Sequence, residues 1–314
     1  MDIFTTMITP YRSDGSIDYD TASAYVDWYF ESGINGIFAV CQSSEIFYLS
    51  LEERVALNRL VYTRAKALEQ RHGKRFTVVS SGHVSDTLEG QMKELNAIWH
   101  SGTDALILIT NRLDPHNEGD EVWIENCKKL LAALPAEARL GLYECPYPYK
   151  RLVTPKILDF CLQTGRFDYM KDTCCDLATM KARCNQLQGS GFRLLNANCQ
   201  TLLASLLAGA DGYCGIMCNY HPRLYAWLGA NFSKAPKTAA LVQAVLGSLG
   251  FTETGLPYPL SAKYHMALCG MQSADIARNR KGERLSDYAR DCVAQMKLAT
   301  DTLERYLIEQ GEQL

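Results

Sequence analysis

Two side chains suited to carbonyl chemistry stand at the ends of short apolar runs. Lys171 follows residues 167–170, and Tyr143 follows residues 140–142. An enclosed, partly apolar setting disfavours the ammonium form of a lysine, and the free amine can attack a carbonyl carbon. A tyrosine beside it can donate and accept the protons of that addition. Taken alone, each residue has a simpler interpretation, which is an ion pair of Lys171 with Asp172 or an ordinary core tyrosine.

A third polar group follows another apolar run. Cys41 is followed by Gln42, Ser43, Ser44 and Glu45. Hydroxyl and amide groups of this kind could hold a carboxylate through hydrogen bonds without adding net charge. Ordinary turn chemistry is the alternative explanation of the same segment.

The elements that must position these groups alternate along the chain. Eight runs rich in apolar and β-branched residues are each followed by a longer stretch with helix signals, and they lie at residues 4–8, 34–40, 76–80, 105–110, 139–144, 169–171, 192–196 and 212–216. The run at 105–109 is apolar throughout, as a parallel strand covered on both faces requires. Such an alternation closes as a (β/α)8 barrel or opens as a doubly wound sheet.

Helix boundary signals stand between these runs. They are capping boxes at residues 50–53 and 86–89, an N-cap followed by proline at 154–155, and glycines that end helices at 33 and 102. No glycine-rich phosphate loop follows the first run, which favours the closed barrel. We therefore predict an α/β fold with a (β/α)8 TIM barrel at residues 1–222 and a C-terminal helical extension at residues 223–314. In a barrel the three polar groups meet at one rim, at the carboxyl ends of strands two, five and six.

Bulk composition excludes several classes of partner. The net charge is -3 and the pI about 6.1, without a basic block, so we expect neither nucleic acid nor anionic lipid as a partner. No stretch approaches the roughly 20 apolar residues of a membrane span, and the first residues do not read as an export signal. We expect a soluble, cytoplasmic protein. Cysteine and histidine spacings match no common metal site, so we expect no metal.

The order of these motifs resembles that of the dihydrodipicolinate synthase and N-acetylneuraminate lyase superfamily, which are class I, Schiff-base-forming barrels. The resemblance covers essentially the whole chain, and its motifs are Thr9-Pro10, residues 41–45, Tyr143-Glu144-Cys145-Pro146 against a Tyr-Asn-x-Pro pattern, Lys171, and residues 208–212 followed by Asn219. The 28 residues from Tyr143 to Lys171 match the interval of the family.

The resemblance implies a role for each matched position. Lys171 is the imine-forming nucleophile, Tyr143 the proton relay, and Ser43 with neighbouring backbone N–H groups the site for the pyruvyl carboxylate. Gln42 and Ser44 flank that site, and Cys214 falls where the family places a carbonyl near the bound keto acid. An iminium draws electrons from the adjacent carbon, so no metal or organic cofactor is needed. The resemblance also implies a homo-oligomer, a tetramer or a dimer.

Departures from the family pattern matter more for the substrate than for the class of reaction. Gln42 replaces a relaying hydroxyl, Ser44 replaces a glycine, and Pro148 stands where the synthases carry an arginine. Residues 111–112 and 197–200 depart from the aromatic pair of the synthases and from the polyol-binding motif of the sialic acid lyases. We expect a 2-oxo acid substrate such as a 2-keto-3-deoxy sugar acid, whose distal carboxylate is bound by Arg112, Lys150 or Arg151.

Three other functions stay open at this stage. A 2-oxo acid dehydratase or a dihydrodipicolinate synthase-like condensing enzyme would use the same imine. A non-catalytic barrel could bind keto acids without turnover, since Gln42 interrupts the relay. A metal-dependent aldolase would need a cluster of histidines or carboxylates at the strand ends, and no His-x-His follows the first strand.

Overall fold

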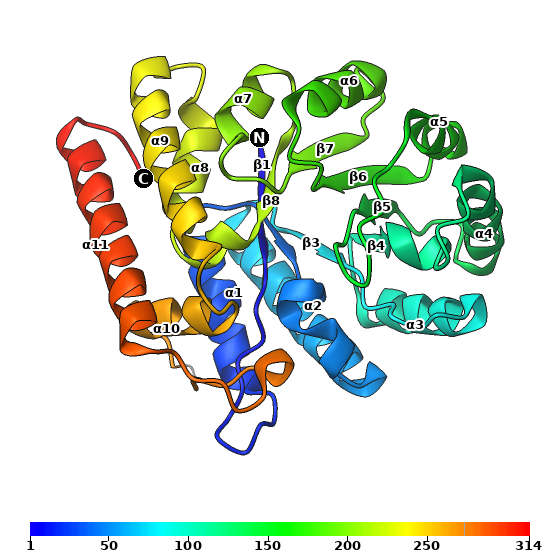
Figure 1. Cartoon of the computed structure of the whole chain (residues 1–314), viewed down its shortest axis with the longest axis horizontal. Helices are drawn as coiled ribbons and strands as arrows, with labels where there is room; N and C mark the ends of the chain where they lie inside the picture. Colours follow the sequence, from blue (N-terminus) through cyan, green and yellow to red (C-terminus); the bar gives the residue numbers. More distant parts are fainter. Residues whose placement is uncertain (273) are drawn as a thin grey trace.

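Eight parallel strands close into a barrel in chain order. The computed structural model describes residues 1–272 and 274–314. The strands are β1 (Asp2–Thr6), β2 (Gly36–Phe38), β3 (Thr77–Ser80), β4 (Ala105–Ile109), β5 (Leu140–Tyr143), β6 (Phe167–Asp172), β7 (Arg193–Asn196) and β8 (Gly212–Gly215). Each strand pairs with its sequence neighbours, and β8 pairs with β1. The strands form the centre of the molecule and the helices surround them (Figure 1). The predicted (β/α)8 barrel is confirmed.

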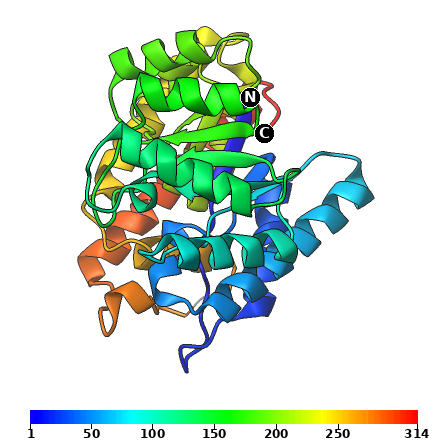
Figure 2. The ribbon, with the colours of Figure 1, turned by 90° about the vertical axis from the view of Figure 1, so that its right-hand side faces the viewer.

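The helices follow the strands one by one. They are α1 (Tyr19–Glu31), α2 (Leu51–His72), α3 (Leu88–Ser101), α4 (Asp120–Ala133), α5 (Pro155–Thr164), α6 (Leu177–Leu187), α7 (Leu202–Leu207) and α8 (Pro222–Asn231). Short 3-10 turns at the strand ends are η1 (Gln42–Ser44), η2 (Ile46–Tyr48), η3 (Thr110–Leu113) and η4 (Ile216–Asn219). The turned view brings α3 to α6, coloured cyan to green, to the front, where they cover the outside of the barrel (Figure 2).

Local sequence signals set most helix boundaries. Ser50 and Glu53 form the predicted capping box at the start of α2, and Thr154 caps α5 with proline at its first position. The capping box predicted at residues 86–89 is wrong by one residue. Thr87 caps α3 by accepting a hydrogen bond from the Gly90 N–H at 3.2 Å, whereas the Asp86 carboxylate pairs with Arg112.

Several strand boundaries differ from those predicted. The strand predicted at residues 4–8 begins and ends two residues earlier, and the one predicted at 34–40 keeps only three residues in the sheet. Residues 39–40 are buried although they have left the strand. An apolar run therefore indicates which residues are buried. The strand itself ends where its backbone stops pairing with the neighbouring strands.

The C-terminal part is helical, as predicted. After α8 come α9 (Pro236–Glu253), α10 (Leu260–Leu268), the turn η5 (Arg278–Arg280) and α11 (Asp287–Glu309). Figure 1 shows α9, α10 and α11 together on one side of the barrel. The predicted boundary between residues 222 and 223 falls at the start of α8. Within residues 1–272 and 274–314, no helix has the length and apolar character that crossing a membrane requires.

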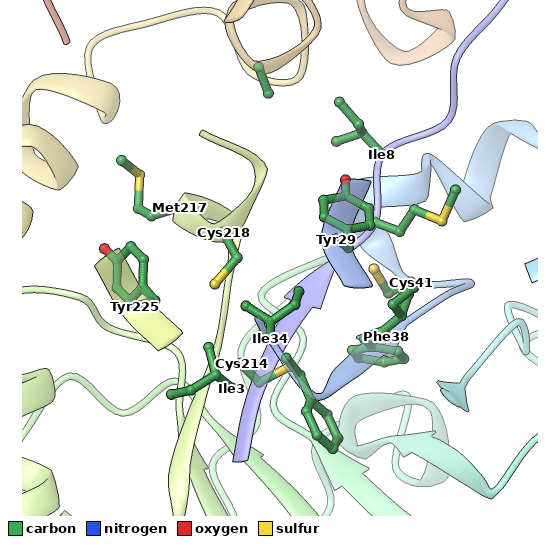
Figure 3. Packing of buried hydrophobic residues seen from close by; sticks show 14 of the residues in the cluster. Ile3, Ile8, Tyr29, Ile34, Phe38, Cys41, Cys214, Met217, Cys218 and Tyr225 are labelled. Atoms are coloured by element: carbon green, nitrogen blue, oxygen red, sulfur yellow. The ribbon is translucent and has the colours of Figure 1, made fainter. Parts of the chain in front are cut away.

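The barrel core is filled by side chains from the strands. Figure 3 shows part of this packing, in which Phe38 of β2 and Cys214 of β8 lie among side chains from the neighbouring helices and loops, such as Tyr29 and Cys41. Successive residues of a strand point to opposite faces, so residues that end neighbouring strands in register share one side of the sheet. Tyr143 and Lys171 are such a pair, since they lie directly opposite each other in the β5–β6 ladder.

Candidate active site

A cavity of about 430 Å³ opens at the carboxyl ends of the strands, where barrel enzymes carry their chemistry. Four of the predicted site residues, Gln42, Ser43, Tyr143 and Lys171, line it together. The remaining lining residues are Pro146, Lys150, Thr173, Cys175, Ala197, Asn198, Gly215, Ile216, Tyr258, Pro259 and Asn279. The structure therefore brings three separate strand ends into one cavity.

Lys171 reaches this cavity from β6 with only 8 % of its surface exposed. Its Nζ lies 4.3 Å from the centre of the Tyr143 ring and 5.7 Å from that of Phe38. Among the described residues no carboxylate oxygen lies within 4.0 Å of this nitrogen, and Asp172 instead pairs with Arg183 on the outer side of the strand. The simple ion pair of Lys171 with Asp172 is thus not formed. The amine faces aromatic surface and the cavity.

Tyr143 is held so that its hydroxyl donates toward the rim. The side chain is buried, it packs edge-to-face on Phe38 at a centroid distance of 5.6 Å, and its Oη donates to Oε1 of Gln42 at 3.0 Å. Burial raises the pKa of Tyr143 well above its ordinary value. The phenol therefore stays protonated over the ordinary pH range, as a proton donor must.

Gln42 is the hydrogen-bond partner of the Tyr143 hydroxyl. Its Oε1 accepts from the Tyr143 hydroxyl and also from the Cys145 thiol at 3.5 Å. A carboxamide oxygen accepts hydrogen bonds but has no proton to pass on. Gln42 therefore orients the phenol, and a proton that leaves Tyr143 must travel by another route.

Ser43 stands at the edge of a network of buried polar groups. Its hydroxyl donates to Oγ1 of Thr6 at 3.0 Å. Nδ2 of Asn219 donates to the Thr6 carbonyl at 2.9 Å and to the Tyr258 hydroxyl at 3.2 Å. These hydrogen bonds join four segments beneath one wall of the cavity. They are strand β1, the turn after β2, the turn after β8 and the C-terminal part.

Two other predicted residues lie behind the cavity surface. The Ser44 hydroxyl lies 2.7 Å from the Met7 carbonyl oxygen and 2.6 Å from that of Ala39, which share its one proton, and it is fully buried. Cys214 is buried in β8, one residue before the lining residue Gly215, and burial raises the pKa of its thiol to about 12. Neither residue is among those that line the cavity.

The three basic residues proposed for a distal carboxylate differ in their surroundings. Arg112 pairs with Asp86 and lies over the Phe47 ring at 5.3 Å, and Arg151 pairs with Asp114 at 2.7 Å and with Asp120 at 3.0 Å. Lys150 is exposed and lines the cavity, where its Nζ donates to the backbone carbonyl of Thr173. Of these three residues, only Lys150 lines the cavity, where it can offer a positive charge to a ligand.

The sequence analysis missed the contribution of the C-terminal part. Tyr258, from the segment before α10, and Asn279, from η5, both line the cavity. The backbone N–H of Asn279 donates to Oε2 of Glu45 at 3.0 Å, which ties η5 to the loop after β2. Both residues lie in segments without strand signals, and no local pattern indicated that these segments return to the barrel rim.

A second hollow, of about 580 Å³, lies at the opposite rim. It is formed by the turns that precede β7 and β8, and its charged residues are already engaged. Arg193 pairs with Asp2 at 2.9 Å, and Asp211 accepts from the Leu194 N–H at 2.8 Å. The smaller cavity is the candidate active site, because Tyr143 and Lys171 line it. Within the part of the chain that the structure describes, no cluster of three or more histidine, cysteine or carboxylate side chains could hold a metal ion.

The chain is similar to known proteins in sequence and in fold. Residues 1–68 match the model of the Dihydrodipicolinate synthetase family. A 4-hydroxy-tetrahydrodipicolinate synthase from Jannaschia sp. (strain CCS1) is 24 % identical over 278 residues, which cover 86 % of this chain and 88 % of that protein.

Solved structures share the fold over nearly the whole chain. A dihydrodipicolinate synthase from Acinetobacter baumannii, complexed with pyruvate, gives a TM-score of 0.80 at 20 % identity and covers 96 % of this chain and 98 % of its own. YagE, an E. coli K12 prophage protein of the dihydrodipicolinic acid synthase family, also in complex with pyruvate, gives 0.81 at 19 % identity with the same coverage.

Proposed function

We propose that the chain, which the comparisons support as a divergent member of the dihydrodipicolinate synthase and N-acetylneuraminate lyase superfamily, is a lyase or aldolase that forms a Schiff base with a 2-oxo acid. One observation carries this proposal. The Lys171 amine is buried over the Tyr143 ring at 4.3 Å and has no carboxylate partner among the described residues. Attack on a ketone requires an amine that faces the substrate and is not held in an ion pair.

The reaction follows from these two groups. Lys171 Nζ adds to the C2 carbonyl carbon, and the oxygen takes a proton that Tyr143 is placed to supply. Loss of that oxygen as water leaves an iminium. When the bond between C3 and C4 breaks, its electron pair moves into the iminium to give an enamine, the C4 hydroxyl returns a proton to the Tyr143 oxygen, and the fragment beyond C3 leaves as an aldehyde. Protonation of the enamine at C3 and hydrolysis of the imine release pyruvate and the free lysine.

The carboxylate of the 2-oxo acid would bind at the turn after β2. The first N–H groups of a helical turn have no partner within it, and η1 begins at Gln42 with Ser43 next. The Ser43 hydroxyl and these two N–H groups are the proposed ligands. In this arrangement Ser44 holds the turn in shape through its bonds to Met7 and Ala39, and Cys214 supports the cavity wall from behind.

The rest of the cavity is proposed to hold the remainder of the substrate. Lys150, Thr173, Cys175 and Asn198 line it beyond the lysine and offer one cation and several hydrogen-bonding groups. A 2-keto-3-deoxy sugar acid, with hydroxyls and a distal anionic group, suits these groups. Lys150 is the proposed contact for the anion, because Arg112 and Arg151 are already paired with carboxylates. Replacing Lys150 with methionine should raise the KM of the true substrate about tenfold and change kcat little.

Reduction with borohydride in the presence of pyruvate tests the proposal. We expect a mass increase of one reduced pyruvyl group, mapped by peptide analysis to Lys171. Lys263 is the internal control, because it is also buried but is paired with Glu45. Labelling of Lys263 or of surface lysines, with Lys171 unmodified, would reject the function.

A keto-acid binder without turnover is the second candidate, and Gln42 favours it. Because its amide cannot pass on the proton of Tyr143, imine could form while bond cleavage fails. A screen of 2-keto-3-deoxy acids for pyruvate release separates the two, and the same screen, with loss of water as the readout, detects a dehydratase. Condensation of pyruvate with an aldehyde would indicate a synthase. The homo-oligomeric state, a dimer or a tetramer, and the cytoplasmic location stay predictions.

A further inference from the structure

A buried cluster lies directly behind the two proposed catalytic residues. Glu144 follows Tyr143 and Asp172 follows Lys171, and both carboxylates pair with Arg183 of α6 on the outer side of the barrel, whereas Tyr143 and Lys171 line the cavity. Arg183 lies between the two carboxylates. We name Arg183, Glu144 and Asp172 the Arg183 cluster.

One guanidinium joins the ends of both strands. Its Nη1 pairs with Asp172 Oδ2, and its Nη2 donates to Glu144 Oε1 at 2.7 Å and to the Val153 carbonyl at 2.6 Å. The three charged side chains are at most 5 % exposed. A planar guanidinium with fixed donor directions sets the spacing between two carboxylates more narrowly than an ammonium on a flexible stem.

The two carboxylates also bind the backbone of the segment that lines the cavity after Lys171. Glu144 Oε2 accepts from the Thr173 N–H at 2.8 Å, and the Thr173 hydroxyl donates back to the Glu144 carbonyl at 2.8 Å. Asp172 Oδ1 accepts from the Cys174 N–H at 2.8 Å. The backbone just after Lys171 is therefore held by the same cluster that holds the residue after Tyr143.

The charges of the cluster depend on one another. Burial raises the pKa of Glu144 against the opposing effect of Arg183. For Arg183, burial favours loss of the proton, but the two carboxylates outweigh it and hold its pKa above the ordinary value. Without the guanidinium, two buried carboxylates would face each other, and the strand ends would have to separate or one acid would have to take up a proton.

We propose that Arg183 is a positioning residue, which through Glu144 and Asp172 holds the Tyr143 ring and the Lys171 amine at the separation that imine formation needs. This inference rests on the proposed function. It assigns no contact with substrate to Arg183. Misplacement of a reacting group by about 1 Å can cost 100-fold in rate, so a change behind the strands is expected to reach the chemistry.

The test compares Arg183 with Arg54, a matched control. The Arg54 side chain is also 5 % exposed, pairs with Glu94 at 3.1 Å and donates to the Gly82 carbonyl, but it lies between α2 and α3. Each arginine is replaced by lysine and by methionine. The readouts are the melting temperature and the rate of pyruvate imine formation at Lys171, measured at saturating pyruvate, well below each melting temperature, and across pH.

We expect Arg183→Met to slow imine formation about 100-fold and Arg183→Lys about 10-fold, with an altered pH profile. The Arg54 variants should lose thermal stability yet keep the rate within about twofold. Equal rates for Arg183→Met and the unmodified protein, or equal losses in the two arginine series, would overturn the inference.

A second variant covers the case in which the Arg183 variants fail to fold. Glu144→Gln keeps the side-chain shape and removes one charge from the cluster, and it should slow imine formation about 10-fold. A wild-type rate in Glu144→Gln then overturns the inference. If the unmodified protein forms no adduct at Lys171, the proposed function fails and the inference with it. If an adduct forms at Lys171 at the same rate in the Arg183 and Glu144 variants as in the unmodified protein, the inference is rejected and the proposed function is kept.

Discussion

Two buried lysines at the barrel rim each lie over a tyrosine ring, but only one of them has a carboxylate partner among the described residues. Lys171 Nζ lies 4.3 Å from the Tyr143 ring centre, and Lys263 Nζ lies 4.3 Å from that of Tyr11. Lys263 also pairs with Glu45 at 3.0 Å and donates to the Ile276 carbonyl at 2.6 Å. Lys171 has no carboxylate within ion-pairing distance in the described residues.

The difference separates a structural lysine from one available for chemistry. Lys263 connects α10 to the loop after β2 and to the segment before η5, so two of its three donors are engaged. The Lys171 amine lies over the Tyr143 ring, and the side chain lines the cavity. Burial alone does not distinguish a nucleophile, since both side chains are buried. What differs between the two lysines is the carboxylate partner, which Lys263 has in Glu45.

The largest expected effect is the loss of imine formation when Lys171 is removed. Lys171→Met should lower the rate of pyruvate incorporation at least about 1000-fold, because Lys150, the other lysine that lines the cavity, is exposed and donates to the Thr173 carbonyl, whereas the Lys171 amine lies over the Tyr143 ring. Its stability should change by about 1 kcal/mol or less, since no carboxylate loses a partner. Borohydride trapping with intact-mass detection gives the rate, and urea unfolding gives the stability. Normal incorporation in this variant would break the comparison.

Removal of Lys263 should have the opposite profile. Lys263→Met leaves the Glu45 carboxylate buried and unpaired, which is expected to destabilise the protein by about 3–5 kcal/mol. The variant that remains folded should still trap pyruvate on Lys171. Urea unfolding and trapping on the same sample measure both. Loss of trapping with unchanged stability would mean that the two lysines have been assigned in reverse.

The phenol beside Lys171 should matter for rate but not for folding. Tyr143→Phe keeps the ring and removes the proton donor, so the trapping rate should fall about 100-fold. The lost hydrogen bond to Gln42 is worth about 1 kcal/mol. Tyr11→Phe is the matched control beside Lys263 and should leave the trapping rate unchanged. Similar rates for the two variants would remove Tyr143 from the mechanism.

The smallest effect concerns pH. Burial lowers the pKa of Lys263 to about 8, against the opposing effect of Glu45. Between that value and the ordinary pKa of 10.5, the unfolded chain binds more protons than the folded one, so stability rises with pH in this window. From pH 8 to 9.5 the gain attributable to Lys263 should be about 1–2 kcal/mol. Urea unfolding at the two pH values should show it in the unmodified protein and not in Lys263→Met, and parallel slopes would contradict it.

The barrel could be predicted because its signals are local. Apolar runs such as residues 105–109 and helix caps such as Ser50 with Glu53 are written in consecutive residues. Tyr143 and Lys171 could be placed at one rim because each ends such a run. Their pairing in the β5–β6 ladder then follows from the closed barrel.

The remaining features depend on contacts between distant segments. Lys263 and Glu45 are separated by 218 residues, and the Arg183 cluster joins α6 to two strand ends. No periodicity marks Tyr258 or Asn279 as cavity residues, because their position is set by how the C-terminal part packs on the rim. Arg112 and Arg151 show the converse case, since their loop positions suggested substrate contact whereas local carboxylates engage them.

A crystal structure of the protein soaked with pyruvate tests the central claim most directly. We predict continuous density from Lys171 Nζ to C2 of pyruvate, with the carboxylate at Ser43 and the Tyr143 hydroxyl beside the reacting carbon, while Lys263 stays paired with Glu45. Pyruvate held without a bond to Lys171, or bonded to another lysine, would contradict it.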